Sequence, residues 1–543
     1  MKFFIRIFSI ALVGCFTSAA AFSQGSVPDD LEFQALKALY DSLAGSGWTT
    51  KTSWPAAGSW PASATATQMD EWYGVVVTNG DITELNFPTN NMTGKMPQAI
   101  GNLTALTRLY FHNNKINSTL PAQLNNLVNL TYLDMGYNLI TGSLPNLPAL
   151  TKLKTLIFRN NTNLAAAPIP SWVTSLTTLT HVNFSISKRN GSIPSNIDNL
   201  TELTFLDLNG NSLTGSIPSS VGSCTKLITL TLANNYLSGS IPESITSLTN
   251  LAYLYLQYNQ LTGSLPSTLG QLNKLNACHI YNNQLSGEIP ASINNLKQLT
   301  DLNLNYNNFT GILPDMSGMV NLTSLQLAKL PNLTPAPIPS WIGSLNKLVV
   351  LDLSDSKRNG SIPSTMGLLT NLANLYLQTN QLSGSLPENF GSCTKLVYLY
   401  LYTNNLSGEL PASLGNLIKL QYLRLSSNSF SGSIPASFAS LTDLRLLYLD
   451  YNQFSGKFPS FVGSWTKLTS INIRDNKFEG AFPTTIGSCP LLTFLRADNN
   501  KFISLPTALL TIPTIQLYFD YNELTAIPNF ATHVSKSGLQ LWL

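Results

Sequence analysis

The chain has 543 residues, and only 10% of them are charged, whereas about 25% of the residues of an ordinary soluble domain are charged. Hydrophobic residues make up 43% of the chain, which is too much for a disordered protein, and the formal net charge is only +3. Because recognition of a polyanion needs a concentrated basic surface, this composition predicts that nucleic acid is not a partner.

Residues 1–23 have the layout of a secretory signal peptide. Two basic residues precede or flank the apolar run 7–14, and the small residues that follow favour cleavage after Ser23. The apolar run is too short to cross a bilayer, and no later stretch is apolar enough for a transmembrane segment. The segment 12–15 also resembles a bacterial lipobox, in which Cys15 carries a lipid anchor. We therefore expect a secreted or cell-surface protein, with an outer-membrane lipoprotein as the alternative.

Residues 24–81 are predicted to form an N-terminal cap. Apolar residues recur at helical spacing along one face of a short helix, at Leu36, Leu39, Tyr40 and Leu43. Four of the eight tryptophans then cluster at Trp48, Trp54, Trp60 and Trp72. We expect their packing to shield the first coil of the core, and a sugar-binding platform is the alternative interpretation.

From residue 82 to residue 534 the sequence repeats itself, mostly with a period of 24. An apolar residue followed by Pro recurs in each unit, as at Pro218 and Pro242. Asn stands seven residues before most of these prolines, as at Asn211 and Asn235, and it follows a Leu-x-x-Leu-x-Leu stretch. Its side chain can bond backbone groups of its own and of the neighbouring coil, which predicts a ladder of asparagines along the stack. One unit cannot bury its apolar face alone, so about nineteen stacked units must share a continuous core.

These units resemble the plant-type class of leucine-rich repeats, whose consensus carries Leu-Thr/Ser-Gly-x-Ile-Pro after the Asn. Residues 251–270 show the pattern, since Asn259 is followed by Leu261-Thr-Gly-Ser-Leu-Pro266. The resemblance implies an α/β solenoid, a right-handed superhelix with a parallel β-sheet on its concave side. The class includes receptor-kinase ectodomains and polygalacturonase-inhibiting proteins, which bind rather than catalyse. The paired cysteines of plant caps are missing from residues 24–81.

A second repeat, with a period of 169 residues, is superimposed on the 24-residue repeat. The segment 167–172 recurs 169 residues later, so a block of seven repeats plus one residue was duplicated. In the two copies Ser187 or Ser356 replaces the turn Asn, and Arg189 or Arg358 replaces a core Leu. We interpret these replacements as inherited irregularities rather than as functional groups.

Residues 535–543 are predicted to start a further repeat, because residues 539–543 alternate like its strand, and the chain stops inside that strand. A solenoid needs a polar terminal cap. We therefore expect that the sequence is truncated and that the native chain continues past Leu543.

No set of residues indicates catalysis, a metal or a cofactor. Cys224 and Cys393 are seven coils apart, roughly 34 Å at strand spacing, whereas a disulfide allows at most about 7 Å between Cα atoms. Cys278 and Cys489 occupy repeat positions that favour burial. The four histidines are too scattered for a triad or a metal site. We therefore predict a protein that is not an enzyme and that has no cofactor or metal.

The outward positions of the predicted strands carry most of the tyrosines. Side chains alternate along a strand, which places the residues around the Leu-x-Leu pair on the concave face. The first tyrosine patch that this predicts comprises Tyr253, Tyr255, Tyr258, His279, Tyr281 and Tyr306. The second tyrosine patch comprises Tyr376, Tyr398, Tyr400, Tyr402, Tyr422, Arg424, Tyr448 and Tyr451.

Tyrosine gives a recognition surface rigid contact area with a polar tip, although an exposed strand favours Tyr without any ligand. In the duplicated block Thr229 and Thr231 correspond to Tyr398 and Tyr400, so the exposed face diverged while the core stayed matched. We predict that the concave Tyr/Asn-rich face binds a protein or peptide. Binding of a polysaccharide or another glycan, including adhesion, is the second interpretation. Ice binding, suggested by the low charge and the Ser/Thr/Asn ladders, is the third.

Overall fold

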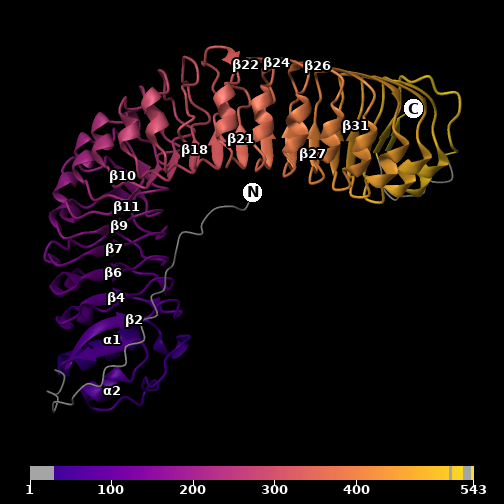
Figure 1. Cartoon of the computed structure of the whole chain (residues 1–543). Coiled ribbons are helices and arrows are strands. Elements are labelled where there is room, and N and C mark those ends of the chain that lie inside the picture. The colour runs from indigo at the N-terminus through magenta and orange to yellow at the C-terminus, as the bar shows by residue number, and fades with distance from the viewer. Residues whose placement is uncertain (1–29, 513–515, 530–539, 543) are drawn as a thin grey trace.

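The computed structural model describes residues 30–512, 516–529 and 540–542. The chain forms a curved stack of coils, with α1 and β2 at one end and the C-terminal coils at the other (Figure 1). A typical coil contains a short strand, a turn and a returning segment with a 3₁₀ helix. The solenoid fold that the repeat predicts is therefore confirmed.

The N-terminal end of the stack carries helices and a hairpin. Helix α1 spans Asp30–Ser42, η1 spans Gly45–Gly47 and α2 spans Ala66–Asp70. Strand β1 (Val75–Thr78) pairs antiparallel with β2 (Asp81–Asn86), and β2 begins the parallel part of the sheet. The division of the chain at residues 23, 81 and 534 stays a prediction, and the signal segment and Cys15 lie outside the described residues.

The tryptophans of this end pack inside the protein. The Trp54 ring lies 5.0 Å from both the Trp48 ring and the Trp72 ring, measured between ring centroids. Its indole N–H donates a hydrogen bond to the backbone oxygen of Tyr73 at 2.9 Å. Trp48, Trp54 and Trp72 are buried and offer no open ring face to a sugar, whereas Trp60 is only partly buried against them.

Over the residues that the structure describes, one sheet of 21 strands lines the concave side of the arc, where Figure 1 labels β18, β21 and β27. After β2, its strands run parallel to their neighbours in chain order: β4 (Arg108–Tyr110), β6 (Tyr132–Asp134), β7 (Thr155–Ile157), β9 (His181–Asn183), β11 (Phe205–Asp207), β13 (Thr229–Thr231), β15 (Tyr253–Tyr255), β17 (Ala277–His279), β18 (Asp301–Asn303), β19 (Ser324–Gln326), β21 (Val350–Asp352), β23 (Asn374–Tyr376), β25 (Tyr398–Tyr400), β27 (Tyr422–Arg424), β29 (Leu446–Tyr448), β31 (Ser470–Asn472), β33 (Phe494–Arg496), β35 (Gln516–Tyr518) and β36 (Gln540–Trp542).

Shorter parallel sheets follow the turn of many coils, as at β22, β24 and β26 in Figure 1. Their strands are β3 (Thr93–Gly94), β5 (Lys115–Ile116), β8 (Ala167–Pro168), β10 (Arg189–Gly191), β12 (Ser212–Leu213), β14 (Ser238–Ser240), β16 (Gln260–Thr262), β20 (Ala336–Pro337), β22 (Arg358–Gly360), β24 (Gln381–Gly384), β26 (Asn405–Gly408), β28 (Ser429–Gly432), β30 (Gln453–Lys457), β32 (Lys477–Ala481) and β34 (Lys501–Ser504). The returning segments carry 3₁₀ helices from η2 (Gln98–Asn102) to η17 (Thr507–Thr511).

The strand register keeps the core in rows. Leu375 pairs with Leu399, and Leu399 pairs with Leu423, so identical side chains stack from coil to coil. All three are buried. Because side chains alternate along a strand, the residues on either side of these leucines must point away from the core. The buried row of leucines therefore fixes which side chains of each strand form the concave surface.

A buried Asn follows the strand in most coils and links neighbouring coils. The Nδ2 of Asn259 donates to the backbone oxygen of Leu256 in its own coil and to that of Leu232 in the preceding coil, both at 3.0 Å. Its Oδ1 accepts the backbone N–H of Leu237 at 3.0 Å. Asn235 and the other turn asparagines make the same kind of bonds, so the ladder that the sequence predicts is confirmed.

A buried Arg takes over this link where Ser replaces the turn Asn. The Ser356 hydroxyl donates to the backbone oxygen of Leu353 in its own coil. The Arg358 Nη2 donates to the backbone oxygen of Thr334 in the preceding coil at 3.2 Å, and its Nε donates to Ser356 at 2.9 Å. Arg189 makes the corresponding bonds in the first copy. In each copy the Arg therefore supplies the bond to the preceding coil that the turn Asn would otherwise make, so the two replacements compensate for each other.

The thiols of Cys224, Cys278, Cys393 and Cys489 are free and buried, as the sequence predicts. Burial raises the pKa of the Cys278 thiol to about 12 and that of the other three to about 11. The reactive species is the thiolate. We therefore expect these four thiols to resist an aromatic disulfide reagent at about pH 8 in the folded protein and to react fully in denaturant.

Mass spectrometry of the labelled peptides assigns the reaction to individual cysteines. Labelling of the folded protein at the rate of the denatured chain, at any of the four positions, would contradict their burial.

Candidate functional site

The second tyrosine patch extends over four neighbouring strands, from β23 to β29. The parallel register places Tyr376 beside Tyr400 and Tyr398 beside Tyr422. The Tyr398 and Tyr422 rings are parallel, with an interplanar angle of 0° and centroids 4.6 Å apart. The Tyr376 and Tyr400 rings meet edge to face at 5.3 Å. The structure therefore brings these predicted residues into one contiguous group.

Arg424 lies among three rings of this patch. Its guanidinium carbon lies 4.9 Å from the Tyr448 ring centroid, 5.3 Å from that of Tyr400 and 5.9 Å from that of Tyr402. The negative face of an aromatic ring attracts a cation at such distances. The tyrosines therefore hold the guanidinium at a fixed place on the concave face.

The first tyrosine patch surrounds a histidine that is buried. His279 is 6% exposed, and its Nε2 lies 2.9 Å from Oδ2 of Asp301 on the next strand. The rings of Tyr255 and Tyr281 lie 5.1 Å and 6.1 Å from the imidazole, and Tyr253 lies beside Tyr255 at 6.3 Å. The prediction that His279 is exposed on this face is wrong, because an acidic neighbour and two tyrosines cover it.

Three of the predicted tyrosines lie in turns rather than in strands. Tyr258, Tyr306 and Tyr451 each precede a turn Asn, with φ of 56°, 54° and 55°. They are 50%, 50% and 47% exposed. Strand alternation does not apply to a left-handed residue, so their expected place in the strand rows is corrected. Tyr258 still contacts Tyr281 at 5.1 Å, and Tyr451 has the Arg474 guanidinium over its ring at 5.3 Å.

Strands β19 and β21 separate the two patches. The predicted residues therefore form two groups on one face rather than a single site.

Sequence reasoning missed an extension of the second patch toward the C-terminus. The Arg496 guanidinium lies 5.4 Å from the Tyr518 ring, which stacks on the Trp542 ring at 4.2 Å. Arg474 and Arg496 both pair with Asp498, at 3.0 Å and 2.8 Å. The same strand alternation that identified the patches was the signal that could have identified Tyr518.

Burial shifts the pKa of one phenol in each tyrosine patch to a clearly higher value. It raises the pKa of Tyr255 and that of Tyr376 to about 12. It also raises the pKa of the Asp352 and Asp450 carboxyls above their ordinary value. At physiological pH these phenols therefore keep their O–H groups as hydrogen-bond donors.

The threonines that precede many strands use their hydroxyls within the protein. Thr107 donates to the backbone oxygen of Thr83, and Thr131 to that of Thr107, both at 3.0 Å. Thr323 and Thr493 make the corresponding bond to the coil before them. Since these hydroxyls are already engaged, this Thr ladder offers little support for ice binding.

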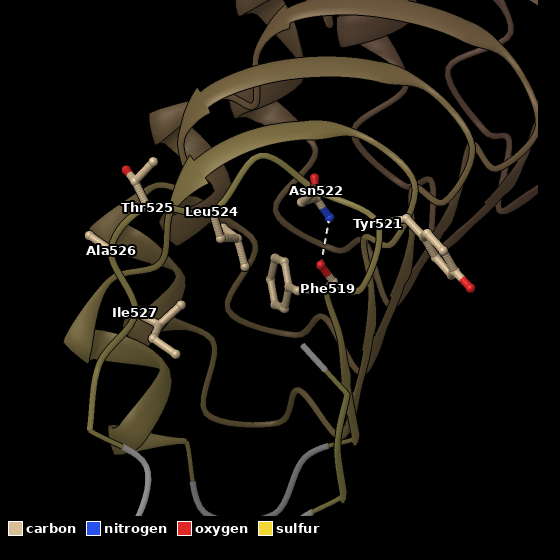
Figure 2. Close-up of a pocket in the computed structure, with 7 residues that line it drawn as sticks. All are labelled: Phe519, Tyr521, Asn522, Leu524, Thr525, Ala526 and Ile527. Atoms are coloured by element: carbon tan, nitrogen blue, oxygen red, sulfur yellow. Dashed lines mark hydrogen bonds between the residues drawn. The ribbon is translucent and has the colours of Figure 1, made fainter.

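A pocket of about 490 Å³ lies in the C-terminal coils, apart from the tyrosine patches (Figure 2). It is lined by Phe519, Tyr521, Asn522, Leu524, Thr525, Ala526 and Ile527. The Nδ2 of Asn522 donates to the backbone oxygen of Phe519 at 2.8 Å, which is the same bond that the other turn asparagines make. None of the lining residues is Asp, Glu, His, Lys or Arg.

Metal-ligating residues do not gather in the described part of the chain, where no group of three or more His, Cys, Asp or Glu could hold an ion. Over the same residues, no helix has the length and apolar character that crossing a membrane requires.

Comparison with family models identifies the repeat. A model described as "Leucine rich repeat" matches residues 201–261 and 394–454, and a second with the same description matches residues 129–149, 298–319 and 371–393. The match at 394–454 contains most of the second tyrosine patch. No match is found among the curated proteins.

Solved structures resemble the chain over more than four fifths of its length. The plant peptide hormone receptor RGFR1 in complex with RGF2 is 31% identical, with a TM-score of 0.75, over 83% of this chain and 76% of that one. The Arabidopsis receptor kinase HAESA, in complex with the peptide hormone IDA and the co-receptor SERK1, is 28% identical, with a TM-score of 0.73, over 84% and 81%. An LRR protein of Leptospira interrogans is 25% identical, with a TM-score of 0.54, over 83% and 99%.

Proposed function

The chain belongs to the leucine-rich repeat family, in its plant-type class, and on this premise we propose that it is a non-enzymatic recognition protein that binds a protein or peptide on its concave face. Two of the similar structures support this proposal, since RGFR1 is in complex with RGF2 and HAESA with the peptide hormone IDA. The second tyrosine patch is the surface that we assign to the partner.

The stacking of the tyrosines is the observation that favours a peptide over a glycan. Sugars are held by open aromatic faces, but the Tyr398 and Tyr422 rings turn their faces toward each other at 4.6 Å. The Tyr376 ring meets Tyr400 edge to face. Such stacking leaves ring edges and phenol hydroxyls for a ligand, and hydroxyls suit the N–H and C=O groups of a peptide backbone.

We place this recognition outside the cytoplasm, at the cell surface or in the secreted fraction, in keeping with the ectodomains that the fold resembles. A lipid anchor at Cys15 is the alternative to a cleaved signal peptide. Both rest on residues 1–23 of the sequence.

Tyr400→Ala combined with Tyr402→Ala tests the proposal. We expect the double variant to lose at least about tenfold in partner capture, because removing central aromatic residues of an interface often costs 2 kcal/mol or more. Capture is measured by pull-down from the native environment, followed by binding to peptide and glycan arrays. The thermal unfolding midpoint should stay within about 2 °C, since both rings lie outside the leucine core.

Tyr236→Ala is the matched control, because Tyr236 is 55% exposed and lies outside both tyrosine patches. It should capture partners like the wild type. Unchanged capture by the Tyr400/Tyr402 variant would exclude the second patch. Array binding to glycans alone would overturn the choice of a peptide.

A further inference from the structure

The guanidinium of Arg424 forms no direct ion pair, although it interacts electrostatically with the Asp450 carboxyl on the next coil. Among the residues that the structure describes, no carboxylate oxygen lies within 4.0 Å of it. Its Nε is buried without a hydrogen-bond acceptor. A buried donor without an acceptor is uncommon in folded proteins. The three surrounding tyrosines hold the cation but do not neutralise it.

The arginines farther along the concave face are already paired. Arg474 lies 2.7 Å from Asp475 and 3.0 Å from Asp498, and Arg496 lies 2.8 Å from Asp498. Asp450, on the coil next to Arg424, accepts a hydrogen bond from the Ser426 hydroxyl instead. Of Arg424, Arg474 and Arg496, Arg424 is therefore the one that can still pair with an external anion.

We propose that Arg424 and the rings of Tyr400, Tyr402 and Tyr448 form a subsite for a carboxylate of the bound peptide, and specifically for an Asp or Glu side chain within the peptide. This inference rests on the proposed function. A planar guanidinium matches the two oxygens of a carboxylate. Neighbouring rings shield the pair from water, which strengthens it. Aromatic residues lie on both sides of Arg424, at Tyr376 on one side and, beyond Ser470 of β31, at Phe494 on the other, which suits a chain that passes over the subsite rather than ends there.

The duplicated block shows that this subsite belongs to the second copy alone. With the offset of 169 residues, Tyr255 corresponds to Arg424 and His279 to Tyr448. Thr231 and Ala233 correspond to Tyr400 and Tyr402. Four neighbouring outward positions therefore differ together. The core leucines Leu230 and Leu254 keep their counterparts Leu399 and Leu423, whereas Cys278 corresponds to Leu447. The first copy supplies a surface of the same backbone without the guanidinium.

The test uses the full chain and four pools of synthetic peptides. Each peptide has about 12 residues, or about 40 Å when extended, which exceeds the patch at roughly 15 to 20 Å. The other positions are randomised over uncharged residues, a central position is fixed as Glu or Gln, and the C-terminus is either free or amidated. The retained peptides are quantified by mass spectrometry for the wild type, Arg424→Gln, Arg424→Lys and the control Arg445→Gln.

We expect the wild type to retain the Glu pools about tenfold better than the Gln pools, with either terminus. A factor of ten corresponds to about 1.4 kcal/mol, the size of a charge-assisted hydrogen bond. The ratio should fall to about 1 in Arg424→Gln and to an intermediate value in Arg424→Lys, which keeps the charge but loses the planar fork. It should stay near ten in Arg445→Gln, because Arg445 is an exposed cation outside the tyrosine rings.

A Glu preference that persists in Arg424→Gln would overturn the proposal, and so would a preference that follows the free C-terminus. If the wild type retains peptides without any acidic preference, this inference fails while the proposed function stands. If it retains no peptide pool at all, the proposed function fails and the subsite with it. Thermal unfolding of each variant confirms that the fold is intact.

Discussion

Replacing Asn259 with Ala is expected to lower the free energy of unfolding by about 3 kcal/mol. The backbone oxygens of Leu232 and Leu256 and the backbone N–H of Leu237 would lose their partner at once. A buried polar group left without a partner costs about 1 to 3 kcal/mol. Urea unfolding followed by circular dichroism measures the loss. Hydrogen exchange should show faster exchange of the Leu237 amide and of the neighbouring coils.

Asn250→Ala is the control for this prediction. Asn250 is only half-buried. Its side chain donates to the backbone oxygen of Thr225 at 3.0 Å and accepts a bond from the exposed Lys274 Nζ at 2.7 Å. Its replacement should cost less than about 1 kcal/mol, as surface substitutions usually do. An equal loss of stability in the two variants would contradict the special role of the buried Asn.

Arg358→Ala is expected to destabilise the protein by about 3 to 5 kcal/mol, because it removes a large buried side chain and leaves buried backbone oxygens without donors. The side chain is 0% exposed, and its loss would leave a cavity between coils. The backbone oxygens of Ser356 and Thr334 would also lose their donors. Burial lowers the pKa of Arg358 to about 10, so the guanidinium is still charged at neutral pH. The measurement is the same urea titration.

The double replacement Ser356→Asn with Arg358→Leu provides the control. It restores the ladder amide and the buried Leu that the next coil has at Asn380 and Leu382. We expect its stability to lie within about 1 kcal/mol of the wild type, since replacing a buried ionic group with well-packed apolar residues is often neutral. If Arg358→Ala proved as stable as the wild type, the Arg would not link the coils.

The repeat made the fold predictable because its stabilising contacts recur at the same spacing. Leu399 packs between Leu375 and Leu423, each one period away, so a pattern read within one coil describes every interface between coils. The role of the turn Asn followed in the same way. Strand alternation likewise placed Tyr376, Tyr398 and Tyr400 correctly on the outward face, because the period of two depends only on the backbone.

Predictions for single surface residues were less accurate where a neighbouring coil changes the environment. His279 stands at an outward strand position, yet Asp301 on the next strand and two tyrosines bury it. Tyr258 and Tyr306 were placed by extending the strand pattern into a turn whose left-handed φ ends the alternation. These differences arise from contacts between coils and from turn geometry, which the pattern within one repeat does not contain.

The sequence by itself determined the solenoid, its parallel concave sheet, its buried leucines and cysteines, and the concentration of tyrosine on one face. Only the tertiary structure decided which of these tyrosines stack, that Arg424 lies among three rings without a direct ion pair, and that Arg358 bonds the preceding coil. The physical reason is the range of the interactions. Periodicity fixes what each coil buries, whereas ion pairs, ring contacts and unpaired donors depend on distances between side chains of different coils.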